Sequence, residues 1–82
     1  MYEVFFSDKA RRQFKKLERE TQERIISAIE RVRIRPEAHV TKLVGDPGYK
    51  LRVGDYRVIM DINKNKLMVL VLKIGHRRNI YK

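Results

Sequence analysis

The spacing of the apolar residues changes at Pro36, and this change is the strongest constraint on the fold. Before Pro36, apolar residues recur every three or four positions over two stretches, which is the spacing of one helix face. After it, apolar and polar residues mostly alternate in short runs, which is typical of strands with one covered face. A chain of 82 residues has room for one small domain. The pattern therefore predicts a single α+β domain over residues 1–82, with helices packed on one sheet.

Two consecutive helices are expected in the first half of the chain, after a short strand over residues 2–6. Ser7 is a good N-cap for the first helix, which runs to about Arg19. Thr21 can cap the second helix, whose isoleucine-rich stripe ends at Pro36. Because almost no linker separates them, the two helices are predicted to form a hairpin.

Strands are expected in the second half, after a loop over residues 37–48 that Leu43 and Val44 anchor to the rest of the domain. The three strands cover residues 49–53, 56–62 and 67–74. Since the last strand is apolar on both faces, we expect it to be central and covered on both sides. The element order is then β-α-α-β-β-β. We predict an antiparallel sheet of about four strands packed against an N-terminal helical hairpin.

The chain is strongly basic, and the excess of positive charge lies in its second half. It has 20 Lys and Arg residues against 10 Asp and Glu, a formal net charge of +10. Residues 1–48 carry 11 basic and 8 acidic side chains, whereas residues 49–82 carry 9 basic and 2 acidic ones. A polyanion or an acidic partner is therefore expected to bind the second half. The alternative is that the charge only maintains solubility, but such charge would be spread over both halves.

Composition excludes several kinds of site. There is no cysteine, so disulfides, thiolate metal ligands and a cysteine nucleophile are absent. His39 and His76 lie in unrelated segments and predict no metal site, and no cofactor is implied. The longest apolar run, residues 67–72, is far shorter than the roughly 20 residues that span a bilayer, so no membrane partner is expected. Charged residues follow the N-terminus at once, so we predict no signal peptide and a cytoplasmic location.

The loop at residues 54–55 sets the register of a hairpin in which two arginines face each other. Arg52 pairs with Arg57 on the face opposite to the apolar pairs, and Lys50 lies two residues along. Directly opposed like charges destabilise a sheet, and a shared anion such as a phosphate would relieve the repulsion. The alternative is that both side chains extend into solvent. Apart from Asp61 this face has no carboxylate, so metal-dependent nuclease chemistry is not expected.

A basic tail follows the last predicted strand. It contains His76, Arg77, Arg78, Tyr81 and Lys82. If the last strand neighbours the hairpin, an arginine of the tail can reach the face that carries the two opposed arginines. Cations with a tyrosine beside them suit an RNA backbone and a base that stacks on the ring. Arginines also suit the charge that builds up during phosphoryl transfer.

Two motifs resemble those of a known family. The run from Leu43 to Ile59, L-x-G-x-x-x-YKLRVGDYRVI, and the tail GHRR-x-I-Y that begins at Gly75 are similar to the RelE/ParE toxin superfamily, more narrowly to its RelE-type branch. The element order matches as well, so the resemblance covers the whole chain. It implies a toxin of a type II toxin-antitoxin system, with a helical hairpin packed on an antiparallel sheet.

The resemblance also implies an activity and partners. It implies an endoribonuclease that cuts mRNA, typically in the ribosomal A site, by attack of the RNA 2′-hydroxyl on the adjacent phosphate without a metal. The implied partners are mRNA, the ribosome and a cognate RelB-like antitoxin. Operator DNA is expected to be contacted only through the toxin–antitoxin complex.

The resemblance assigns a role to each matching position. Lys50 and Arg52 match two basic positions of the first hairpin strand, and Arg57 matches the phosphate-binding arginine of the next strand. Arg77 matches the arginine after the last strand, and Tyr81 resembles the C-terminal tyrosine that orients or stacks on the nucleotide. On this basis we expect Arg57 and Arg52 to hold the scissile phosphate and Arg77 to stabilise the leaving oxygen.

Two departures from the family pattern bear on the mechanism. Position 52 is Arg where the best-known members have Lys, and arginine stays protonated, so Arg52 cannot act as a base. The spacing from Arg77 to Tyr81 is shorter than in some members. Either Lys50 or His76 is then expected to accept the proton of the 2′-hydroxyl. The remaining cations expected to bind RNA are Lys73, Arg78 and Lys82.

Two other functions remain open. A ParE-type toxin shares the fold but acts on DNA gyrase and usually lacks the arginine and tyrosine set. A non-catalytic RNA-binding module, or a degenerate toxin, would also have affinity for nucleic acid at this charge. Cleavage of mRNA distinguishes the RelE-type interpretation from both.

Overall fold

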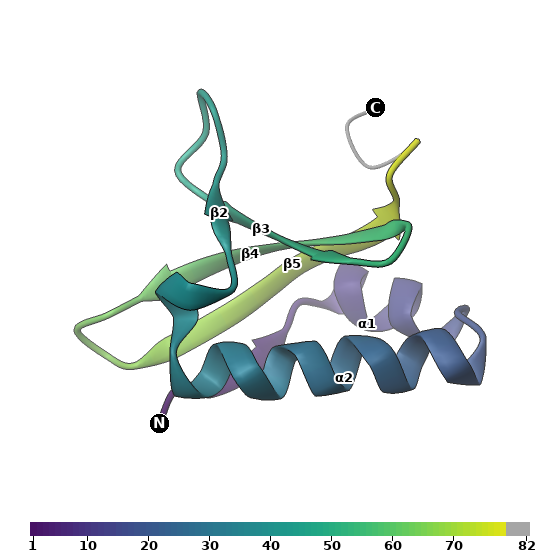
Figure 1. Cartoon of the computed structure of the whole chain (residues 1–82), viewed down its shortest axis with the longest axis horizontal. Helices are drawn as coiled ribbons and strands as arrows, with labels where there is room; N and C mark the ends of the chain where they lie inside the picture. The colour runs from purple at the N-terminus through teal and green to yellow at the C-terminus, as the bar shows by residue number, and fades with distance from the viewer. Residues whose placement is uncertain (79–82) are drawn as a thin grey trace.

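A computed structural model describes residues 1–78 of the protein (Figure 1). The helices are α1 (Asp8–Lys15), α2 (Arg19–Ile34) and the short 3-10 helix η1 (Pro36–Ala38). The strands are β1 (Glu3–Phe6), β2 (Thr41–Lys42), β3 (Tyr49–Val53), β4 (Tyr56–Asn63) and β5 (Met68–His76). The predicted α+β class is confirmed, and so is the predicted order of elements apart from η1 and the added strand β2.

The strands form one sheet in the order β1-β5-β4-β3-β2. β4 pairs antiparallel with both β3 and β5, but β1 pairs parallel with β5, from Glu3 opposite Met68 to Phe6 opposite Val71. The expected antiparallel sheet of about four strands is thus corrected to a mixed sheet of five. The alternation of apolar and polar residues identifies the two faces of a strand, but it does not show whether the neighbouring strand runs parallel or antiparallel. The helices and the β3–β4 hairpin provide the long crossover that parallel pairing needs.

Strand β2 lies within the segment that the sequence predicts as a loop, residues 37–48. It has only two residues, and it pairs with the start of β3. Both of its side chains are exposed. No apolar alternation marks such a strand, which is why the sequence pattern does not predict it.

The helix boundaries differ from the predicted ones by a few residues. Ser7 caps α1 as expected, because its Oγ accepts a hydrogen bond from the backbone N of Ala10 at 3.0 Å. However, α1 ends at Lys15, and α2 begins earlier than predicted. The N-cap of α2 is Glu18, without a side-chain capping bond, and Thr21 lies inside the helix.

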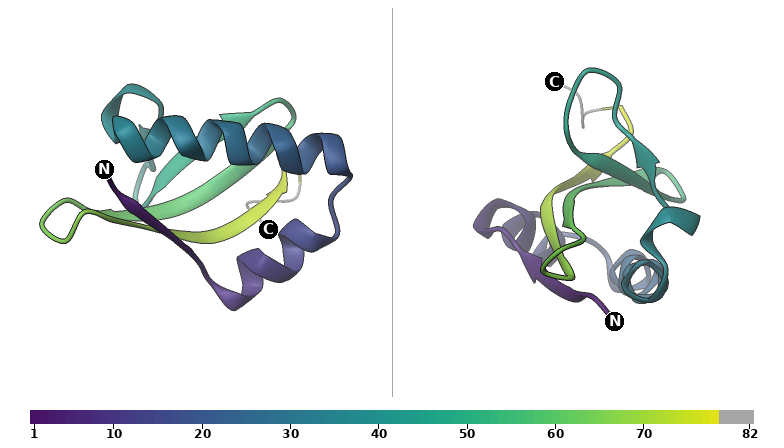
Figure 2. Two further views of the ribbon diagram at one scale, coloured as in Figure 1. Left: turned by 90° about the horizontal axis from the view of Figure 1, so that it is seen from below. Right: turned by 90° about the vertical axis from the view of Figure 1, so that its left-hand side faces the viewer.

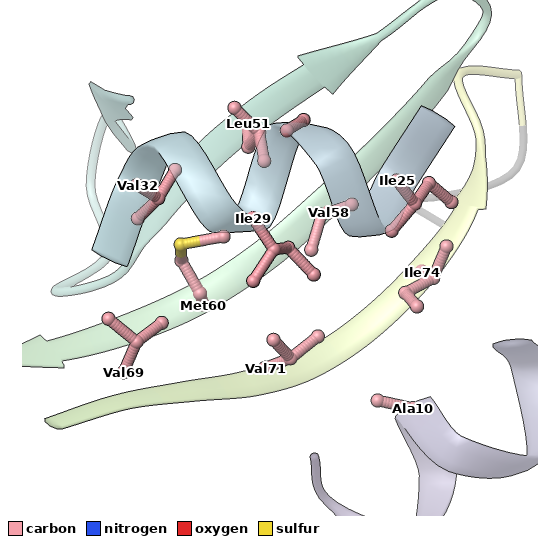
Figure 3. Packing of buried hydrophobic residues seen from close by; sticks show 11 residues of the cluster. Ala10, Ile25, Ile29, Val32, Leu51, Val58, Met60, Val69, Val71 and Ile74 are labelled. Atoms are coloured by element: carbon pink, nitrogen blue, oxygen red, sulfur yellow. The ribbon is translucent and has the colours of Figure 1, made fainter. Parts of the chain in front are cut away.

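Both helices pack on the same face of the sheet, and the core lies between them and β3, β4 and β5 (Figure 2, Figure 3). The buried cluster consists of Ala10, Ile25, Ala28, Ile29, Val32, Leu51, Val58, Met60, Val69, Val71 and Ile74. We call the face of the sheet away from the helices the outer face. β5 is an inner strand as predicted, but it is not covered on both sides, since Leu70 and Leu72 are 38% and 36% exposed.

An irregularity in β5 changes which side chains reach the outer face. Val71 pairs with Met60, but the next pair is Lys73 with Ile59, so Leu72 is one extra residue in β5. Beyond this bulge the alternation of β5 is inverted. As a result Lys73 shares the outer face with the polar residues of the hairpin.

Side chains of α1 hydrogen bond to the backbone of β5 at the bulge, where β1 has ended. The Oγ of Ser7 donates to the carbonyl of Leu72 at 2.8 Å. The Oε1 of Gln13 accepts from the backbone N of Ile74 at 2.7 Å. These bonds satisfy backbone groups of β5 that no strand pairs on this side, and they fix the bulge against α1.

We predict that Ile25→Ala destabilises the protein strongly. Ile25 is fully buried, so its truncation leaves a cavity in the core and should lower the free energy of unfolding by about 2–5 kcal/mol. Ile26→Ala is the matched control on the same helix, because Ile26 is 43% exposed. It should cost about 1 kcal/mol or less. Urea unfolding followed by circular dichroism measures both, and equal losses would contradict the assignment of the core face of α2.

Candidate nucleic-acid interface

The hairpin register is the predicted one, and it places two rows of residues across the outer face of β3, β4 and β5. The first row is Arg52, Arg57 and Gly75, and the second is Lys50, Ile59 and Lys73. Neighbouring strands lie about 4.8 Å apart, so the four cations of the two rows form one cluster. We call this cluster the cationic face: Lys50, Arg52, Arg57 and Lys73.

The cationic face points away from the helices because its neighbours on the strands are buried. Leu51 on β3 and Val58 on β4 pack in the core, and successive side chains of a strand point to opposite faces. Arg52 is exposed, and the other three cations are half-buried. The cations are therefore accessible to a ligand, while the rigid sheet holds their positions.

The salt bridges found among residues 1–78 lie elsewhere. They join side chains within α2 or link η1 to the β4–β5 turn, and none of them includes Lys50, Arg52 or Lys73. Asp61 is the next outward residue of β4. Its carboxylate accepts a hydrogen bond from the backbone N of Ile62 at 3.1 Å. The charges of Lys50, Arg52 and Lys73 therefore favour an anionic ligand on this face.

The shifted pKa values also lie away from the cationic face. Glu37 of η1 and Lys64 of the β4–β5 turn form an exposed salt bridge at 3.1 Å. A backbone hydrogen bond and the hydrogen bond from Lys64 lower the pKa of the Glu37 carboxyl. The same contact with Glu37 raises the pKa of the Lys64 amine. This pair ties η1 to the end of the sheet and takes no part in the cationic face.

The beginning of the tail is joined to the hairpin loop. The backbone N of Arg77 donates to the carbonyl of Asp55 at 2.9 Å. Arg77 therefore follows β5 at the end of the sheet where the Arg52–Arg57 pair lies, as the sequence analysis requires. Arg77 and Arg78 are both exposed.

His76 lies on the opposite face of the sheet from the two arginines. It pairs with Tyr56, and the two rings meet edge to face with 5.6 Å between their centroids. Tyr56 also pairs with Val53, which packs against the core, so this row points to the helix side. The Nδ1 of His76 accepts a long hydrogen bond of 3.4 Å from the backbone N of Arg78. The fold thus brings Lys50, and not His76, together with the arginines.

Two predicted site residues, Tyr81 and Lys82, lie outside the described residues. Within residues 1–78, no group of three or more His, Cys, Asp or Glu side chains is arranged to hold a metal ion. No helix in the same part of the chain is long and apolar enough to cross a membrane.

A pocket that the sequence pattern does not indicate borders the cationic face. The β2–β3 loop stands on the outer face (Figure 1) and encloses, with β4 and β5, a pocket of about 300 Å³. The pocket is lined by Leu43, Asp46, Pro47, Gly48, Ile59, Leu72 and Lys73. Of the two predicted loop anchors, Leu43 is half-buried in this wall, but Val44 is 99% exposed and anchors nothing. The apolar Leu43 was the one signal in the sequence that pointed to this contact.

A family model matches nearly the whole chain. The model is described as the ParE toxin of the type II toxin-antitoxin system parDE, and it matches residues 4–81. A search among curated proteins gave no match.

Solved toxin structures are similar to this chain over most of their length. The toxin-antitoxin complex RelBE2 from Mycobacterium tuberculosis has 25% sequence identity and a TM-score of 0.84, over 93% of this chain and 98% of that chain. The intact E. coli RelBE toxin-antitoxin complex has 30% identity and a TM-score of 0.80, over 93% and 96%. The YoeB/ParE toxin from Agrobacterium tumefaciens has 14% identity and a TM-score of 0.79, over 93% and 98%, so the likeness is one of fold.

We predict that Arg52→Gln stabilises the free protein. The substitution removes one of two directly opposed positive charges and should raise the free energy of unfolding by about 0.2–1 kcal/mol at low salt. The gain should shrink as salt screens the repulsion. Lys42→Gln in β2 is the control, since Lys42 is exposed and pairs with Tyr49 rather than with a cation. Urea unfolding at low and high sodium chloride measures the difference. A variant no more stable than the wild type at low salt would contradict the predicted repulsion.

Proposed function

Because the chain belongs to the RelE/ParE superfamily of toxins from type II toxin-antitoxin systems, we propose that it is a RelE-type endoribonuclease that cuts mRNA in the ribosomal A site. The observation that carries this proposal is the Arg52–Arg57 pair on the outer face. A chain under selection for stability alone has no use for two opposed cations at this position. A phosphodiester bound between them offsets their repulsion and is itself the group that reacts.

The proposed reaction needs no metal. The 2′-oxygen of one nucleotide attacks the adjacent phosphorus and loses its proton. The bond to the 5′-oxygen of the next nucleotide breaks, and that oxygen takes up a proton from water. The products are a 2′,3′-cyclic phosphate and a free 5′-hydroxyl. Negative charge on the phosphoryl oxygens rises in the pentacoordinate transition state. Fixed cations therefore stabilise the transition state more than the ground state.

Each cation has a proposed part in this reaction. Arg57 and Arg52 hold the scissile phosphate, and Arg77 stabilises the leaving 5′-oxygen. Lys50 shares the outer face with the arginines, so we assign it, rather than His76, the acceptance of the 2′-hydroxyl proton; this role requires its side chain as the uncharged amine. The ribosome contributes the position of the substrate, which reduces what the toxin itself must supply. Lys73 and Arg78 are assigned to the RNA backbone, together with Lys82, and Tyr81 to the nucleotide.

The proposed partners follow from the same family. Several of the similar structures are complexes of RelE with RelB, and we propose that a cognate RelB-like antitoxin neutralises this toxin in the cytoplasm. Contact with operator DNA would then occur only through the complex. An antitoxin segment that covers the cationic face needs acidic side chains, for the same reason that RNA suits it.

The match to the ParE toxin model favours a second candidate function, inhibition of DNA gyrase. The two functions make different demands on the outer face. A nuclease depends on the arginines as groups that touch the reacting phosphate. A gyrase inhibitor has no such requirement, so its activity would not follow the Arg57 side chain in particular.

We predict that the protein cuts ribosome-bound mRNA and that Arg57→Ala lowers the rate of cutting by about 10²–10³-fold. Primer extension on mRNA in a purified translation system, matched to the source in ribosomes and temperature, measures the cuts. Arg77→Ala should reduce cleavage far more than ribosome affinity, because its proposed contact exists mainly in the transition state. Arg19→Ala is the control, since the Arg19 side chain is 91% exposed at the start of α2.

The outcomes separate the two candidate functions. Discrete cuts in ribosome-engaged codons that Arg57→Ala removes and Arg19→Ala retains support the nuclease. If the wild type leaves mRNA uncut and blocks supercoiling by purified gyrase, the RelE-type proposal is wrong.

A further inference from the structure

The pocket beside the cationic face is separate from the Arg52–Arg57 pair, since neither arginine lines it. Its walls are mainly apolar and come from the β2–β3 loop on one side and from Ile59 and Leu72 on the other. Its volume of about 300 Å³ is at the lower end of the range of small-molecule sites. Such a pocket has room for one flat ring system and is too small for a helix or a folded segment of a partner.

The loop that forms one wall is held firmly on the sheet. Its ends are joined by a hydrogen bond from the backbone N of Leu43 to the carbonyl of Gly48 at 2.9 Å. A Cβ on Gly48 would lie 3.2 Å from the carbonyl oxygen of Met60 and 3.3 Å from Cδ1 of Leu43. Glycine therefore lets the loop approach β4 closely, and Ile59 beneath it is only 4% exposed. The wall is thus formed before any ligand binds.

The pocket and the cationic face adjoin at Ile59 and share one residue, Lys73. Ile59 pairs with Lys50 on one side and with Lys73 on the other, and Lys73 also lines the pocket. The row of Arg57 is two residues away along β4, roughly 6.6 Å at the usual rise of a strand. A phosphate held by the arginines would therefore have a base of the same nucleotide chain within reach of the pocket.

Two charged residues, Asp46 of the loop and Lys73 of β5, line the otherwise apolar pocket. The carboxylate of Asp46 has two acceptor oxygens and no donor. Guanine presents two adjacent donors, N1–H and the 2-amino group, on its Watson–Crick edge. Uracil has one donor there, and adenine and cytosine have an amino group next to a ring acceptor. A carboxylate can therefore pair with guanine through two hydrogen bonds but with each other base through one.

We propose that this pocket holds one of the two nucleobases that flank the scissile phosphate, and that Asp46 makes guanine the preferred base. The apolar walls contact the faces of the ring, and Lys73 binds the backbone at the mouth of the pocket. The inference rests on the proposed function, because it assigns the specificity of the same site. Asp46 is a specificity residue here and takes no part in breaking the bond.

Cleavage mapping with Asp46→Asn tests the proposal. On an mRNA library with all four bases at the positions flanking the cut, the wild type should prefer guanine at one of them. Asp46→Asn should reduce this preference about tenfold, because an amide cannot accept from both guanine donors. Cleavage of sites without guanine should stay within about twofold of the wild type. Val44→Thr is the matched control, since Val44 is in the same loop but 99% exposed and not part of the pocket.

A binding measurement separates this inference from the proposed function. Nuclear magnetic resonance of the ¹⁵N-labelled full chain is titrated with guanosine monophosphate, uridine monophosphate and inorganic phosphate. Guanosine monophosphate should shift the amide signals of residues 43–46, 48 and 72–73 in addition to those of residues 50–57, whereas inorganic phosphate should shift only the latter, and uridine monophosphate should shift the pocket signals less. If guanosine monophosphate leaves the pocket signals unshifted, or if Asp46→Asn keeps the wild-type base preference, the pocket proposal is overturned even when mRNA is cut. If mRNA is not cut but guanosine monophosphate binds as expected, the nuclease proposal fails and the base pocket stands.

Discussion

The packing of α2 against β3, β4 and β5 determines which side chains of this chain are available for chemistry. Ile25 and Val32 of the helix meet Val58 and its neighbours on one face of the sheet (Figure 3). Since side chains alternate along a strand, burial of one set directs the other set to the outer face. Arg52 and Arg57 are therefore held in place by the burial of the residues beside them. The site depends on the core for its geometry and contributes nothing to it.

The bulge in β5 decides which side chains of this strand lie on the outer face. Val71 points into the core, and regular alternation through Leu72 would turn Lys73 inward and His76 outward. With the bulge, Ile74 is buried, Lys73 is beside Ile59, and His76 is on the helix side. The bulge in turn is stabilised by hydrogen bonds from α1 to the backbone of β5. One local irregularity thus places Lys73, and not His76, on the face of the sheet that carries the arginines.

The sequence pattern could predict those features of the fold that depend on residues close together in the sequence. The pairing of Arg52 with Arg57 follows from the two-residue loop between their strands and from the alternation of side chains along each strand. Both features can be recognised from residues close together in the sequence. The parallel pairing of β1 with β5 could not be predicted in this way, because it joins residues more than sixty positions apart. Nothing in the amino-acid sequence marks the bulge at Leu72. The sequence therefore could not show on which face of the sheet His76 lies. The pocket combines a loop without periodicity and two distant strands, and its shape exists only in the folded chain.

The outer face combines features that a stable monomer avoids, and their combination limits what can bind there. Opposed arginines repel each other, and Leu70 and Leu72 stay exposed further along β5. A ligand that brings negative charge to the arginines and apolar surface to the leucines binds the folded state and stabilises it by mass action. For the proposed nuclease, the phosphates and bases of RNA would supply the negative charge and the apolar surface, and an acidic, amphipathic antitoxin segment would supply them with carboxylates and apolar side chains.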